Sequence, residues 1–245
     1  MMANHWLYSL YPPYLVRHQL RVLRQQQRYR QARRSQSENL FKIFDRYRCL
    51  FVHIPKAGGV SFYNSLFAAA AKEPYIKSIG HYSIKDYELI FGSKALQSYF
   101  KFTVVRNPWA RVFSAYTFLR SGGFHQKDAA WAEKHLSKFS SFEDFVNQWL
   151  CAQNAARAIH FVPQHEFLRS RSGQINIDHV GRLETIQADF DVIKNRLGVG
   201  EEIQHLNRGS RSRESRSYRQ MYTARSKRVV ASVYKKDIEV FGYEF

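Results

Sequence analysis

Two short turns carry residue types that bind phosphate groups. The first is residues 55–61, which read PKAGGVS and follow a short apolar run. Adjacent glycines allow a tight turn whose backbone N–H groups can approach an anion, while Lys56 adds a mobile cation and Ser61 a hydroxyl donor. A helix that starts after the glycines would direct its positive end to the same place. The turn therefore predicts a phosphate site; a tight turn with a surface lysine is the alternative.

The second turn is residues 105–116, which read VRNPWARVFSAY. Arg106 ends an apolar run, and its guanidinium can hold a phosphate through two parallel hydrogen bonds. Ser114 and Arg111 are three residues apart and share a helix face. Arginines that only pair with carboxylates are the alternative. Two such turns in one chain predict a nucleotide with phosphates at two separate positions.

The first turn differs from the loop of nucleoside triphosphatases. That loop has the pattern Gly-x-x-x-x-Gly-Lys-Ser/Thr, with the lysine after the glycines. Here Lys56 precedes Gly58 and Gly59. We therefore expect a phosphate-binding turn of another kind.

Strands that alternate with helices are expected to position both turns. Apolar runs at residues 49–54 and 100–106 end close to a proline and predict buried strands, and a short third strand is expected at 179–183. Helices are expected at residues 60–71, 83–91, 109–119, 142–151, 185–197 and 224–240. This order predicts an α/β fold with a central parallel sheet flanked by helices. Such folds bind ligands at the carboxyl ends of their strands.

Positive charge is concentrated in two blocks. The 38 Lys and Arg against 20 Asp and Glu give a net charge of +18. Residues 1–48 hold ten basic and two acidic residues, and residues 205–228 hold eight and one. Such blocks attract polyanions, and a solvated charged face is the alternative.

The first basic block predicts a helical arm outside the main fold. Within it, residues 14–36 show only a loose apolar stripe, made of Leu15, Leu20, Val22 and Leu23. We therefore divide the chain into an arm at residues 1–38 and a globular domain at residues 39–245.

Composition excludes several classes of protein. A chain of 245 residues that is 44% hydrophobic and 16% aromatic is not globally disordered. Two cysteines, Cys49 and Cys151, cannot form a disulfide scaffold or a cysteine-based zinc site, and no metal-ligand spacing appears. No apolar run approaches the roughly 20 residues that cross a bilayer, and the start of the chain lacks a signal-peptide pattern.

Both turns resemble donor-binding segments of sulfotransferases. Residues 55–61 resemble the 5′-phosphosulfate-binding loop of that family, and residues 106–116 are similar to its 3′-phosphate-binding segment. The final residues, 233–245, read VYKKDIEVFGYEF and resemble the end of the branch that acts on carbohydrates. That branch includes Golgi and bacterial enzymes, and the resemblance covers about residues 49–245. It implies a P-loop-like sulfotransferase fold.

The resemblance implies 3′-phosphoadenosine 5′-phosphosulfate (PAPS) as co-substrate and no metal. A sulfuryl group would move to a hydroxyl of a carbohydrate or glycolipid acceptor, with positioning and charge stabilisation supplying most of the catalysis. Lys56 would neutralise the leaving phosphate, and Arg106 and Ser114 would bind the 3′-phosphate. Gly58, Gly59, Val60 and Ser61 would hold the 5′-phosphate. The whole loop implied to bind the co-substrate is Lys56, Ala57, Gly58, Gly59, Val60 and Ser61.

The acceptor hydroxyl needs a general base, and we predict His81. It precedes an expected helix, and related enzymes carry a histidine or glutamate in this general region. Histidine, with a pKa of about 6.5, accepts a proton at neutral pH. His125 is the second candidate, whereas His53, inside the first strand, is expected to pack or to support the site. Glu184 is expected to form a structural salt bridge or to orient a neighbour.

The second basic block and the arm add hypotheses of their own. Residues 205–213 have the composition of a lid over an anionic nucleotide, and a flexible basic loop is the alternative. The arm is a candidate contact for an anionic membrane or an acidic polymer. We expect a cytoplasmic protein, peripheral to a membrane at most; a place in the Golgi lumen would require that an anchor has been removed.

Two other functions stay open from the sequence. A basic nucleic-acid-binding protein would use the arginine-rich blocks and tyrosines, but no helix-turn-helix, zinc-finger or RNA-recognition signature is present, and nucleic acid is not the expected partner. A sulfotransferase-like fold that binds a glycan or membrane without turnover would have no need of Lys56, Ser61, Arg106 and Ser114.

Overall fold

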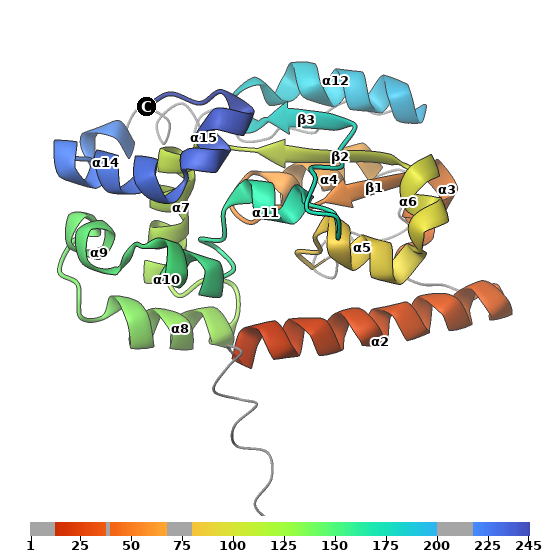
Figure 1. Cartoon of the computed structure of the whole chain (residues 1–245), viewed down its shortest axis with the longest axis horizontal. Helices are drawn as coiled ribbons and strands as arrows, with labels where there is room; N and C mark the ends of the chain where they lie inside the picture. Colours follow the sequence, from red (N-terminus) through yellow and green to blue (C-terminus); the bar gives the residue numbers. More distant parts are fainter. Residues whose placement is uncertain (1–12, 38–39, 68–79, 200–217) are drawn as a thin grey trace, which may run out of the picture.

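The computed structural model describes residues 13–37, 40–67, 80–199 and 218–245. A parallel sheet with the strand order β1–β2–β3 lies at its centre. The strands are β1 (Cys49–Val52), β2 (Phe100–Val105) and β3 (His179–Arg182). Figure 1 shows helices around this sheet, with α12 beyond β3 and the long helix α2 on the opposite side of the molecule. The prediction of an α/β fold with a parallel sheet and flanking helices is confirmed.

The register of the strands brings their carboxyl ends to one edge of the sheet. Cys49 pairs with Phe100 at the start of β1, and Phe102 pairs with His179 at the start of β3. All four residues of β1 are buried, as expected for a parallel strand covered on both faces. The chain therefore leaves β1, β2 and β3 at the same edge, where ligands of α/β folds bind.

The helices connect the strands and complete the core. Their bounds are α2 Pro13–Ser35, α3 Lys42–Tyr47, α4 Gly59–Phe67, α5 Ile84–Phe91, α6 Ser93–Ser98, α7 Pro108–Arg120, α8 Gln126–Leu136, α9 Phe142–Trp149, α10 Ala152–Arg157, α11 Gln164–Leu168, α12 Ile186–Leu197, α14 Ala224–Val233 and α15 Lys235–Phe241, with a 3₁₀ turn at Leu183–Thr185. Residues 68–71 of the first expected helix lie outside the described residues. The helix expected at 224–240 is divided in two at Tyr234.

Asn107 explains why α7 starts immediately after β2. Its side-chain oxygen accepts hydrogen bonds from the N–H groups of Trp109 and Ala110, at 3.1 and 3.4 Å. Pro108 occupies the first turn, where its missing N–H costs no hydrogen bond. The strand therefore passes into the helix within two residues, and α7 keeps a fixed position at the edge of the sheet.

Two apolar clusters form the core. One surrounds the sheet and includes Phe51, Phe102 and Phe190, all at most 1% exposed. The other lies around α7, α9 and α14 and includes Phe145, Phe161 and Tyr234. The edge of the sheet at which the strands end lies next to α7, so residues of both clusters support it.

Helix α2 packs against α5. Val22, Tyr29 and Ala32 of α2 are at most 6% exposed. The Tyr29 hydroxyl donates to Asp45 at 2.7 Å. His18 is 2.9 Å from Asp86 of α5. These contacts combine apolar burial with partly buried polar pairs.

The expectation of an arm outside the main fold is therefore wrong for residues 13–35. Leu20 and Leu23, two members of the expected apolar stripe, are each 48% exposed. The helix was expected, but the face on which it packs was not. The division of the chain at residue 38 stays a prediction.

Candidate active site

The turn after β1 has the backbone conformation that its glycines predict. Lys56 has φ of 65° and Gly58 has φ of 80°, both in the left-handed region. Lysine adopts this region at a cost of about 1–2 kcal/mol, so the surrounding contacts must hold it there. Gly59 begins α4, and a Cβ at this position would lie 2.4 Å from Cδ2 of His53. Position 59 therefore requires glycine, because the His53 ring lies too close for any larger side chain.

Arg111 holds this turn in place through a hydrogen bond to its backbone. Its side chain is 1% exposed, and its Nε donates to the carbonyl of Pro55 at 2.9 Å. Its Nη1 donates to the carbonyl of Val162, also at 2.9 Å. Within the described residues its Nη2 has no hydrogen-bond partner, and burial lowers the pKa of the guanidinium. Arg111 therefore joins the turn to the segment before α11 and acts as a positioning residue.

The end of β2 is fixed by Gln164. The backbone N–H of Arg106 donates to Gln164 Oε1 at 2.9 Å, and Gln164 Nε2 donates to the Arg106 carbonyl at 2.8 Å. Gln164 is completely buried, and its own N–H donates to Asp237 of α15 at 2.7 Å. The guanidinium of Arg106 lies 3.4 Å from the Lys56 carbonyl. The two turns identified in the sequence are therefore in contact.

The Lys56 ammonium lies over an aromatic ring of α7. Its Nζ is 3.8 Å from the centre of the Phe118 ring, a distance at which the ring attracts a cation. Ser114, which is half-buried, precedes Phe118 by one helical turn, so both face the same side of α7. His160 packs on the same Phe118 ring, with 5.2 Å between ring centres. Lys56 and His160 thus contact one aromatic side chain, and Ser114 lies on the same face of α7.

His81 is held in one tautomer by the backbone. Its Nδ1 is 3.0 Å from the carbonyl oxygen of His53, and because a carbonyl only accepts, Nδ1 carries the hydrogen. Nε2 of the neutral ring then has the free electron pair that can accept a proton. Burial, together with His53, His160 and Arg21, lowers the pKa of His81 well below 6.5. The ring is therefore neutral at neutral pH, and the electron pair that can accept a proton lies on Nε2.

His160 and Asp128 form a pair that sequence reasoning missed. Nε2 of His160 is 3.4 Å from Asp128, and this contact lowers the pKa of the carboxyl group. Nδ1 of His160 is buried and has no hydrogen-bond partner in the described part of the chain. The ring centres of His160 and His81 are 6.5 Å apart. The only sequence feature that could have pointed to His160 is its place, with Gln164, on either side of the short apolar run at residues 161–163.

The other predicted site residues differ in how far they are exposed and in what they contact. Ser61 is half-buried and Val60 is 44% exposed, both in the first turn of α4. His125 is exposed, and its N–H donates to Asp128. Glu184 accepts from the Asn107 N–H at 2.8 Å and from the Tyr243 hydroxyl at 3.0 Å, so it orients the start of α7 and the C-terminal segment. The predicted lid at 205–213 lies outside the described residues.

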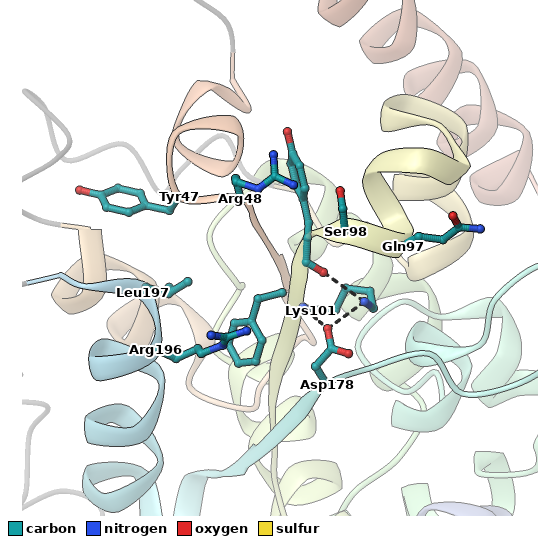
Figure 2. A pocket seen from close by; sticks show the side chains of 10 residues that line it. Tyr47, Arg48, Gln97, Ser98, Lys101, Asp178, Arg196 and Leu197 are labelled. Atoms are coloured by element: carbon teal, nitrogen blue, oxygen red, sulfur yellow. Dashed lines mark hydrogen bonds and ion pairs between the residues drawn. The ribbon is translucent and has the colours of Figure 1, made fainter.

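A pocket of about 480 Å³ lies at the other edge of the sheet, where the strands begin (Figure 2). Lys101 in this pocket is bonded to Asp178 at 2.8 Å and to the Tyr99 carbonyl at 3.1 Å. Arg48 lies over the Tyr99 ring. Lys101 and Arg48 of this pocket therefore contact other groups of the protein. The pocket is separate from the site built around Lys56 and Arg106.

Among the residues that the structure describes, no cluster of three or more His, Cys, Asp and Glu side chains could hold a metal ion. None of the helices in the same ranges is long and apolar enough to cross a bilayer.

A model of the sulfotransferase family matches residues 39–244, and the chain belongs to this family. Among its relatives is carbohydrate sulfotransferase 10. The mouse protein is 25% identical over 237 residues, covering 82% of this chain and 66% of the relative. The human protein is 24% identical with the same coverage, and the chicken protein is 24% identical over 236 residues, covering 65% of its length. The matches thus span just under two thirds of these relatives. No solved structure matches the chain significantly.

Proposed function

We propose that this chain transfers a sulfuryl group from PAPS to a hydroxyl of a carbohydrate acceptor. The observation that carries the proposal is the contact between Lys56 and Arg106, which joins the two turns expected to bind phosphate at the carboxyl edge of a parallel sheet. Membership of the sulfotransferase family supports the donor, and relatives named carbohydrate sulfotransferase support the acceptor class.

The chemistry of the site suits a nucleotide with two separate phosphates. The N–H groups in the first turn of an α-helix have no acceptor within the helix, so those of α4 are suited to hold the 5′-phosphate. Ser61 adds a hydroxyl donor in that turn. Arg106 and Ser114 would hold the 3′-phosphate, because both side chains donate; Arg106 lies between β2 and α7, and Ser114 lies in the second turn of α7. The donor supplies the sulfuryl group that is transferred.

His81 is the proposed general base. Its Nε2 would accept the proton of the acceptor hydroxyl as that oxygen bonds to sulfur. The bond between sulfur and the bridging phosphate oxygen breaks, and the Lys56 ammonium would offset the negative charge that develops on the leaving phosphate. His160, which shares Phe118 with Lys56, would lie in the same site.

Titration calorimetry with 3′-phosphoadenosine 5′-phosphate (PAP) tests the donor site. We expect micromolar binding by PAP, far weaker binding by adenosine 5′-phosphate, and at least about a hundredfold loss in Lys56→Ala/Arg106→Ala, since each removes a charge-assisted contact. The matched control is Lys94→Ala/Arg120→Ala, which removes two exposed cations elsewhere. A folded protein that binds neither nucleotide would contradict the proposal.

A further inference from the structure

Helix α2 carries a large excess of positive charge. Its 23 residues include seven arginines and no acidic residue. One face, with Val22, Tyr29 and Ala32, is buried against the rest of the molecule. The arginines lie on the remaining surface of the helix, and all are exposed. The residues of α2 precede the part of the chain that the family model matches.

Four of these arginines form a straight stripe. Arg17, Arg21, Arg24 and Arg28 follow one another at spacings of four, three and four residues, which places them on one side of the helix. At a rise of about 1.5 Å per residue the stripe is about 16 Å long, enough for several sugar units. Arg30 and Arg34 lie on another side of the same helix. The exposed Leu20 and Leu23 are also outside the stripe.

The stripe passes directly beside the proposed base. The Arg21 guanidinium lies 4.9 Å above the Tyr82 ring, and its Nη1 is 2.9 Å from the point where a Cβ on Gly80 would lie. Gly80 and Tyr82 are the two neighbours of His81 in the chain. Arg21 also contacts His18 at 3.0 Å, and His18 pairs with Asp86 of α5. These contacts hold Arg21 beside the His81 segment, between Arg17 on one side and Arg24 and Arg28 on the other.

We propose that this stripe binds a carboxylated or sulfated sugar chain and guides it past His81, so that the acceptor is an anionic polysaccharide. The inference rests on the proposed function and assigns the acceptor class of the same site. A row of guanidinium groups matches the repeated anions of such a chain, and each can bind a carboxylate or a sulfate through two hydrogen bonds. A lipid surface is disfavoured, because the stripe borders the His81 segment and the exposed leucines of α2 lie off it.

The experiment compares two double variants of the whole protein with the donor site filled by PAP. Arg17→Gln/Arg24→Gln removes two charges from the stripe, and Arg30→Gln/Arg34→Gln removes two from another side of α2. The probes are heparin, hyaluronan, neutral dextran and vesicles of phosphatidylcholine and phosphatidylserine. We expect the stripe variant to bind heparin or hyaluronan about tenfold more weakly, the other double variant to change less than about twofold, and dextran not to bind. PAP affinity should be the same in all three proteins.

Equal losses in both double variants would overturn the proposal, because general charge would then account for binding. A loss confined to the vesicles would assign the stripe to lipid and would also overturn it. If the protein binds PAP but neither acidic polysaccharide, the acceptor assignment fails and the proposed function stands. If it binds polysaccharide but not PAP, the proposed function fails, and the stripe is no acceptor site.

Discussion

Replacing Arg111 should separate the positioning of the donor site from contact with the donor. Arg111 is buried and donates to the carbonyls of Pro55 and Val162, both at 2.9 Å. Methionine has a similar length and no hydrogen-bond donor. Arg111→Met should therefore leave the apolar packing largely in place and release the turn that carries Lys56.

The size of the effect follows from the two carbonyls. A buried acceptor that loses its partner costs about 1–3 kcal/mol, so two cost about 2–6 kcal/mol. Part of this is recovered, because the variant no longer buries a charged guanidinium whose Nη2 lacks a partner in the described residues. We expect a net loss of about 3 kcal/mol in the free energy of unfolding. For a chain of this size that is a fall of about 6–12 °C in Tm.

Two measurements check the prediction. Thermal and urea unfolding give the stability, and calorimetry gives the affinity for PAP, which should fall at least about tenfold although residue 111 does not face the ligand. Arg120→Met, on the exposed end of the same helix, is the control and should stay within about 0.5 kcal/mol of the unchanged protein. The reasoning is refuted if both variants lose equal stability, or if Arg111→Met is destabilised yet binds PAP as before.

Three further outcomes are expected. The acid limb of kcat/KM should lie below pH 6.5, because the neutral form of His81 is required and its pKa is lowered. Arg21→Gln should move the limb to higher pH, because Arg21 is one of the groups that lower this pKa. A limb at or above pH 6.5 would exclude His81 as the base. Gly59→Ala should cost about 1–3 kcal/mol and weaken PAP binding, as measured by unfolding and calorimetry, and unchanged values would contradict the close ring contact. Gln164→Leu should cost about 2–4 kcal/mol in urea unfolding by unpairing both backbone groups of Arg106, whereas a loss below 1 kcal/mol would show that water replaces the amide.

The elements that position the site could be predicted because their signals are local. The β1 and β2 strands are short apolar runs with proline just beyond them, and α7 has Asn107 and Pro108 at its start. The division at Tyr234 has no such signal, since neither glycine nor proline is present there. Tyr234 is buried, and its hydroxyl donates to the Phe161 carbonyl at 2.7 Å, so a contact distant in sequence holds the residue at which α14 ends.

The missed residues are buried polar groups. Gln164 and Asp237 are completely buried, and each is bonded to segments far away in the chain. Hydrophobic periodicity treats a glutamine or an aspartate as a surface residue, so it cannot find them. The same limit explains α2, where Tyr29 is buried and donates to Asp45 whereas Leu20 and Leu23 stay exposed.

The long-range contacts of the site have a kinetic consequence. Arg111 and Pro55 are 56 residues apart, Arg106 and Gln164 are 58 apart, and Asn107 bonds to the Glu244 carbonyl across 137 residues. Each contact requires a large loop to close before it contributes any stabilisation, so folds built on such contacts form slowly. We therefore expect the proposed nucleotide site to be among the last parts of the molecule to assemble during folding, after the local helices. Added PAP would then stabilise the completed fold without accelerating the earlier steps.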